Sequence, residues 1–194
     1  MKDVEYEFDT NRVNPKKFAL WLLIIAAIML FAGLTSAYIV RMGEGNWYRF
    51  ELPKTFLYST ITIVISSFTM WWAYRSAKKA EYAQLKMGLL VTLMLGFGFC
   101  YLQYLGWQAL NQMGLFFADD VHGDRVSASF IYALSGLHLV HILGGIIFLI
   151  ILTIRVFVTK ATSTLLLSTN MCNTYWHFVG ILWVYLYLFF YFAH

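Results

Sequence analysis

Charge is confined to short segments of this chain, and five long segments carry none. Uncharged stretches run over 18–40, 55–74, 87–118, 126–154 and 161–194. Each has the roughly 20 residues that a helix needs to cross about 30 Å of hydrocarbon. With 60% hydrophobic and 12% charged residues, the composition also excludes an ordinary soluble globule. The chain is therefore predicted to be an all-α integral membrane protein.

The uncharged stretches predict a bundle of five transmembrane helices over about 18–40, 54–75, 82–113, 126–156 and 168–193. A polar arm, 1–17, precedes the single transmembrane domain, 18–194. The short turn between the second and third helices predicts an antiparallel hairpin. A transmembrane barrel would instead show alternating polar and apolar residues in pieces of about ten. The start "MKDVEYEFDTNRVNPKK" is too acidic for a secretory signal, so we expect the first helix to be retained.

The basic residues predict the orientation of the bundle. If the helices alternate in direction, ten of the 14 Lys and Arg residues lie on the side of the N-terminus. The other four, Arg41, Arg49, Lys54 and Arg125, lie on the opposite side. This asymmetry places the N-terminus in the cytoplasm. The basic residues are dispersed along membrane boundaries, which suits anionic lipid headgroups and argues against nucleic-acid binding.

All ten carboxylates lie outside the cores of the predicted helices. Intramembrane acids usually mark proton and ion pathways, and their absence argues against a self-contained pump or carrier. The sequence also contains no internal repeat, which argues against a transporter built from inverted repeats. The external segment with Asp119, Asp120, His122 and Asp124 is compatible with a bound cation or, more commonly, with a solvated acidic loop.

Three histidines lie inside predicted helices. His138 and His141 are three residues apart, so both side chains project from one helix face, which Ser135 extends. A buried imidazole needs hydrogen-bond partners, and we expect His177 of the next helix to meet this face directly or through water. A lipid-headgroup or proton-relay contact, or ligation of a metal or haem, are the alternatives.

Small polar and sulfur-containing side chains add further expectations. Ser59, Ser66 and Thr69 predict a polar stripe on the second helix that allows close helix packing. Cys100 and Cys172 fall in different predicted helices and suggest packing rather than a disulfide. The aromatic residues of the last helix are interpreted mainly as packing residues.

Five ordered motifs resemble one known family. They are "FALWLLIIAAIMLFAGLTSAYI", "LPKTFLYSTITIVISSFT", "LGFGFCYLQYLGW", "SGLHLVHILGG" and "YWHFVGILWVYLYLFF". The last resembles the closing helix of cytochrome c oxidase subunit III, with its Trp-His-Phe-Val-Asp pattern followed by Trp. The fourth is similar to the His-x-x-His helix of the same family. The resemblance covers about 18–193.

The resemblance implies a non-catalytic accessory subunit III of a respiratory haem-copper oxidase, which reduces oxygen to water and pumps protons. It implies that subunits I and II are partners and hold the haems and copper, and that this chain holds no cofactor except bound phospholipid. The expected roles are to stabilise the catalytic subunit, hold lipid and support proton uptake. A larger respiratory supercomplex is a further candidate partner, and a bacterial plasma membrane is the expected location. His138, His141, Trp176 and His177 match the family as structural or lipid-contact positions.

The sequence departs from the family at three acids. Ala27, Gly106 and Gly180 stand where the family has Glu, Glu and Asp, so no role of those acids is carried over. Longer members have seven helices, two before a lipid-filled cleft and five after it. We expect this chain to supply the last five, the other wall of the cleft being missing or belonging to a neighbour.

The sequence is also compatible with two rival functions. One is the similar accessory protein of a quinol oxidase or a nitric oxide reductase. The other is a haem-b membrane anchor, in which His138 or His141 pairs with His177 as axial ligands.

Overall fold

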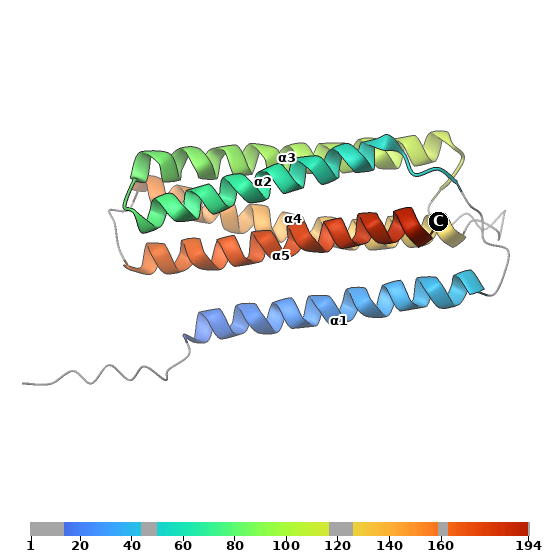
Figure 1. The fold of residues 1–194 in the computed structure, drawn as a ribbon, viewed down its shortest axis with the longest axis horizontal. Coiled ribbons are helices and arrows are strands. Elements are labelled where there is room, and N and C mark those ends of the chain that lie inside the picture. Colours follow the sequence, from blue (N-terminus) through green and yellow to red (C-terminus); the bar gives the residue numbers. More distant parts are fainter. Residues whose placement is uncertain (1–13, 44–49, 117–125, 159–162, 194) are drawn as a thin grey trace, which may run out of the picture.

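The computed structural model describes residues 14–43, 50–116, 126–158 and 163–193. All the regular structure in these residues is α-helical. The helices are α1 (Pro15–Gly43), α2 (Lys54–Lys78), α3 (Tyr82–Gln112), α4 (Val126–Val158) and α5 (Ser163–Ala193). Each is long and apolar enough to cross a membrane, and they lie roughly alongside one another (Figure 1). The prediction of an all-α, five-helix membrane bundle is confirmed.

Two helices begin earlier than predicted. α1 begins at Pro15 rather than at 18, because the Asn14 side chain caps it: the Lys16 backbone N–H donates to Asn14 Oδ1 at 3.1 Å. Proline is favoured at the first helical position, where its missing N–H costs nothing. α5 begins at Ser163 rather than at 168. Neither Pro nor Gly occurs in 163–179 to stop the helix.

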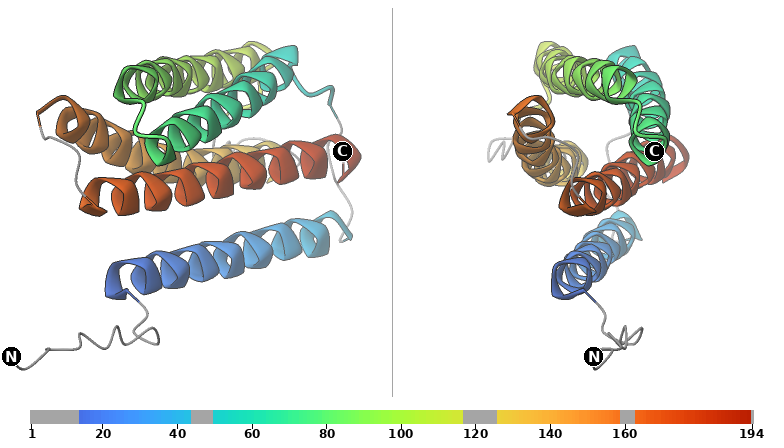
Figure 2. Two further views of the ribbon diagram at one scale, coloured as in Figure 1. Left: turned by 60° about the vertical axis from the view of Figure 1, so that its left-hand side comes forward. Right: turned by 90° about the vertical axis from the view of Figure 1, so that its left-hand side faces the viewer.

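Helices α2 to α5 form a ring of four, and α1 lies outside it (Figure 2). Each of the four packs against two neighbours in the order α2, α3, α4, α5 and back to α2. α1 contacts α4 and α5 but, within the described residues, neither α2 nor α3. The interior of the molecule is therefore enclosed mainly by α2 to α5, and α1 covers one side of it.

The hairpin of α2 and α3 is the closest helix pair. Three residues, 79–81, separate the helices, and Ala80 takes a positive φ of 58°, the left-handed conformation that commonly ends a helix. Further along, a Cβ added to Gly88 would lie 2.8 Å from Ala73 Cβ. Glycine at this position allows the two backbones to approach. The predicted antiparallel hairpin is confirmed.

The helices alternate in direction along the chain (Figure 1). Among the described basic residues, seven lie at the end of the bundle where α1 begins and two at the other. The seven are Lys16, Lys17, Arg75, Lys78, Lys79, Lys86 and Arg155, and the two are Arg41 and Lys54. The alternation assumed in the charge comparison is confirmed, while the cytoplasmic position of the basic end stays a prediction.

Candidate functional site

The polar stripe predicted on α2 joins that helix to α3 and α5. Gln103 Nε2 donates to Ser59 Oγ at 2.9 Å, and Trp176 Nε1 donates to Ser66 Oγ at 2.7 Å. The hydroxyls of Thr69 and Thr92 lie 2.8 Å apart. Each of these three α2 hydroxyls thus forms a hydrogen bond with a different residue of a neighbouring helix. The predicted role of the stripe in helix packing is confirmed.

The inner face of α5 is marked by two tryptophans seven residues apart. Trp176 and Trp183 are fully buried, and Trp183 Nε1 donates to Thr60 Oγ1 of α2 at 3.0 Å. The ring of Trp176 lies against Gly96 and Gly145, where an added Cβ would be 3.0 and 3.1 Å away. Trp176 is therefore an interior packing residue that lipid does not reach.

His138 ties α4 to α5 through a backbone carbonyl. It is fully buried, and its Nε2 lies 3.0 Å from the carbonyl oxygen of Val179. The carbonyl can only accept, so Nε2 carries the proton and donates. Aromatic rings surround it, with the Trp183 ring at 4.9 Å and the Phe99 ring at 5.7 Å between centroids. The predicted role in joining two helices is confirmed for His138, but the prediction that His177 is its partner was wrong.

His141 shares the face of His138 but makes no ring contact with His177. Its Nδ1 lies 2.9 Å from the carbonyl oxygen of Leu137 in its own helix. Both imidazoles lie beside Phe31 of α1, with centroid distances of 6.5 Å for His138 and 5.5 Å for His141. The shared face predicted from the spacing of three is confirmed, and it meets α1 as well as α5.

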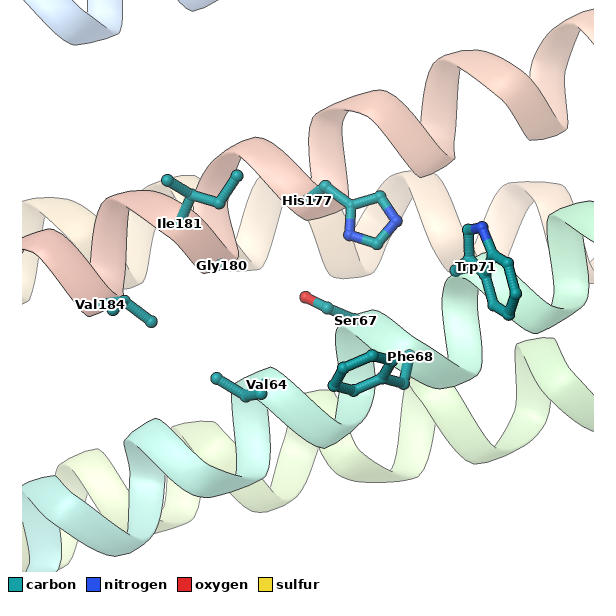
Figure 3. A pocket seen from close by; sticks show the side chains of 8 residues that line it. All are labelled: Val64, Ser67, Phe68, Trp71, His177, Gly180, Ile181 and Val184. Carbon is teal, nitrogen blue, oxygen red and sulfur yellow. The ribbon is translucent and has the colours of Figure 1, made fainter.

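His177 points towards α2 and away from α4 (Figure 3). It follows Trp176 directly, and successive residues of a helix are rotated by about 100°. Since Trp176 occupies the inner face, His177 is turned to the side. The proposed stripe of three histidines joining α4 and α5 is therefore corrected to His138 alone.

A groove between α2 and α5 contains His177. Its volume is about 450 Å³. Four residues of each helix line it: Val64, Ser67, Phe68 and Trp71 of α2, and His177, Gly180, Ile181 and Val184 of α5 (Figure 3). Neither Ser67 nor the groove was predicted from the sequence. The spacing of the lining residues could have indicated the groove, because the four residues of each helix follow the i, i+3, i+4, i+7 pattern of one helix face.

Two of the three positions that depart from the resembled family pattern, Gly106 and Gly180, are closely packed. A Cβ at Gly180 would lie 2.9 Å from Ser67 Oγ, so the Ser67 hydroxyl would have to move to admit one. A Cβ at Gly106 would lie 3.1 Å from the Phe56 ring. A side chain at either position would require these neighbouring side chains to shift. Ala27 is buried on α1, and nothing in the structure explains that substitution.

The structure places no cluster of metal ligands in the part of the chain that it describes. Groups of three or more His, Cys, Asp or Glu side chains do not occur there. Cys100 and Cys172 are both free, as expected. The acidic segment with Asp119, Asp120, His122 and Asp124 lies outside the described residues. The interior can donate and accept hydrogen bonds, but its five helices contain no acid within their spans.

Fold and site together define a multi-pass helical membrane protein with a hydrogen-bonded interior. The chain belongs to the cytochrome c oxidase subunit III family, whose model matches residues 9–194. It is 30% identical over 188 residues to a probable cytochrome c oxidase subunit 3 of Nocardia farcinica, covering 94% of this chain and 90% of that relative. A probable cytochrome c oxidase subunit 3 of Mycobacterium tuberculosis is 28% identical over 190 residues, with the same coverage.

Cytochrome c oxidase subunit 3 of Locusta migratoria is 33% identical over 148 residues, which cover 76% of this chain and 52% of that relative. The family resemblance drawn from the five motifs is thus confirmed. The bacterial relatives align over nearly their whole length, and the insect relative over about half of its own.

Proposed function

We propose that this protein is the non-catalytic accessory subunit III of a respiratory haem-copper oxidase that reduces oxygen to water and pumps protons. Membership of the cytochrome c oxidase subunit III family carries the proposal. Its partners are the oxidase subunits I and II, and a larger respiratory supercomplex is a further candidate partner. The redox centres lie in those partners, and this chain stabilises the catalytic subunit and supports proton uptake.

The interior of the bundle supports a structural role. The two acids among the described residues, Glu51 and Glu81, lie in connections between helices. The polar groups inside are hydroxyls, amides, indoles and imidazoles, several of which are already bonded to a neighbouring helix. Such groups hold helices together but form no chain of titratable carboxylates for proton transfer. Support for proton uptake therefore acts through a partner rather than through a pathway in this chain.

Bound phospholipid is part of the proposal. A second groove, of about 360 Å³, lies between α1 and α5. Its lining is almost wholly apolar and consists of Ile28, Phe31, Ala32, Phe178, Ile181, Leu182 and Tyr185. It suits an acyl chain, while the seven basic residues at one end of the bundle suit anionic headgroups. We place that basic end in the cytoplasm, and the protein in a bacterial plasma membrane, because relatives of matching length are bacterial.

A haem-b anchor is disfavoured by the arrangement of the histidines. His138 and His141 lie on the face of α4 that meets α5 and α1. His177 faces α2 instead of either of them. The donor set among the described residues therefore does not fit an axial histidine pair. An accessory role in a quinol oxidase or nitric oxide reductase is the remaining alternative, since it needs the same fold.

Purification from the native host tests the proposal. A tagged chain is isolated in mild detergent, and the chains that accompany it are identified together with the visible spectrum. We expect oxidase subunits I and II, with haem absorption that disappears when this chain is separated from them. Nitric oxide reductase or quinol oxidase chains in their place would select the alternative. A Soret band from the separated chain would overturn the accessory role.

Removal of the chain provides a functional readout. Oxidase lacking it should begin oxygen consumption at nearly the normal rate and then lose activity faster over repeated turnover. The initial rate reports the redox centres of the partners, and the decay reports protection by this subunit. An unchanged decay would argue against the protective role.

A further inference from the structure

The α2–α5 groove holds a polar group without a partner. His177 is half-buried, and neither of its ring nitrogens has a hydrogen-bond partner among the described residues. Ser67 Oγ lines the same groove. A neutral imidazole carries one donor and one acceptor, and leaving them unpaired in hydrocarbon is unfavourable. The groove therefore contains an imidazole donor and an imidazole acceptor that no described residue pairs.

The depth of His177 in the membrane limits which molecules can form a hydrogen bond with it. It lies 14 residues after the start of α5 and 16 before its end, so about 20 Å of helix extends on either side. Ser67 is 13 residues after the start of α2 and 11 before its end. Both side chains are therefore near the middle of the bilayer, roughly 15 Å from either headgroup layer. Phospholipid headgroups do not reach this depth, and acyl chains offer no hydrogen bond.

The shape of the groove matches a helix. Its walls are two helix faces, each presenting side chains at i, i+3, i+4 and i+7 over two turns. Figure 3 shows His177 and Ser67 between the two helices, with apolar side chains along the same faces. Gly180, about one helical turn after His177, adds no side chain to the groove. The next turn of α5, with Gly180 and Ile181 on this face, therefore supplies no polar partner for His177.

From these observations we propose that the groove lined by His177 and Ser67 docks a transmembrane helix of a partner chain. That helix presents a side chain with an acceptor, such as a carboxylic acid, an amide or a hydroxyl, to His177 near the membrane midplane. This proposal rests on the proposed function, because it assumes that the protein works within a membrane complex. It adds which face of the chain meets the partner and through which chemistry.

Photocrosslinking in the native complex tests the docking face. A photoreactive amino acid replaces Phe68 on one side of the groove or Ile181 on the other, which are 67% and 70% exposed. Met94 of α3 and Met29 of α1, at 72% and 71%, are matched lipid-facing controls. Mass spectrometry then identifies each adduct. We expect Phe68 and Ile181 to capture the same transmembrane peptide of one partner chain.

Substitution of His177 tests the chemistry. His177→Leu removes both polar atoms and should lower the shared crosslink about fivefold, the factor that a hydrogen bond of ~1 kcal/mol supplies. His177→Gln keeps a donor and an acceptor and should preserve it. Val64→Trp, which fills the groove from the opposite wall, should abolish the crosslink without touching His177. These substitutions should leave the crosslinks from Met94 and Met29 unchanged.

Several outcomes would overturn the proposal. Lipid adducts alone from Phe68 and Ile181 would show that the groove faces the bilayer. Two unrelated peptides, or a crosslink equally strong with His177→Leu, would exclude one helix docked on the imidazole. Isolation of a complex other than an oxidase would instead contradict the proposed function, and the groove would still be tested in that complex.

Discussion

The ring of helices α2, α3, α4 and α5 and the outer helix α1 are all apolar enough to cross a membrane. They differ in the contacts that join each helix to its neighbours. The ring is closed by hydrogen bonds between side chains of neighbouring helices, several of them donated by buried indole or amide groups. α1 is joined to α5 by a bond between the Thr35 and Tyr185 hydroxyls at 3.2 Å. The Phe31 and Tyr38 rings add contacts with α4 and α5.

This difference shows which part of the chain determines the fold. Between helices in lipid, there is little hydrophobic driving force, so close packing and hydrogen bonds provide the specificity. The ring has both, through its glycines and its hydroxyl stripe. α1 presents many large apolar side chains outward, including Met29 at 71% exposure. We infer that the ring is the stable unit and that α1 is attached more loosely.

Removing the largest interior side chain should have the largest effect. Trp176→Ala deletes a fully buried indole and leaves Ser66 without its donor, so we expect roughly 3–5 kcal/mol lower unfolding free energy. Trp21→Ala on α1, where the indole is 49% exposed, is the matched control and should change little. Unfolding in mixed SDS micelles measures both. Equal losses would mean that α1 is as firmly packed as the ring.

A pair of glycine substitutions compares the two regions directly. Gly88→Ala brings a Cβ within 2.8 Å of Ala73 Cβ and 3.1 Å of its Cα. We expect a loss of about 1–3 kcal/mol from overpacking of α2 against α3. Gly33→Ala on α1 meets nothing within 4 Å and should be neutral or slightly stabilising. The same SDS titration reports both, and a neutral Gly88→Ala would contradict the close α2–α3 packing.

Replacing the interhelical histidine should have a smaller effect. His138→Leu removes the bond to the Val179 carbonyl, and bonds of this kind between membrane helices contribute about 0.6 kcal/mol on average and ~1.7 kcal/mol at most. His141→Leu removes a bond within α4 and a ring contact with Phe31 of α1, but no hydrogen bond to another helix, and serves as the comparison. A larger loss from His141→Leu than from His138→Leu would reverse the roles assigned to the two imidazoles.

The weakest expected effect belongs to α1. Thr35→Val removes the hydroxyl that meets Tyr185, but that hydroxyl also donates within its own helix to the Phe31 carbonyl at 2.9 Å. We expect less than ~0.6 kcal/mol. The measurement is the unfolding free energy, and a loss exceeding that of His138→Leu would show that α1 depends on a strong polar tie.

The features that the sequence predicted are those set by periodicity and charge. The long uncharged stretches predicted the five transmembrane helices. The small hydroxyl residues of α2 predicted a polar stripe, and its side chains form hydrogen bonds with α3 and α5. The spacing of His138 and His141 gave their common face. Each of these follows from which residues share one side of a helix, without knowledge of its neighbours.

The features that escaped prediction depend on how helices rotate against one another. The acceptor for His138 is a backbone carbonyl, and a sequence gives no sign of which carbonyl a buried imidazole meets. His177 was assigned to the interior because it is polar in an apolar segment. The spacing of seven between Trp176 and Trp183 marks the inner face of α5 and turns His177 sideways. Recognising that spacing would have predicted the groove side.

Hydrogen–deuterium exchange of the chain in lipid nanodiscs tests the difference between ring and α1 most directly. Backbone amides near the middle of α1 are compared with amides at matching depth in α3 and α4. We predict exchange at least about tenfold faster in α1, which corresponds to an opening free energy ~1.4 kcal/mol lower. Equal or stronger protection of α1 would contradict the conclusion that the four-helix ring is the stable unit of this protein.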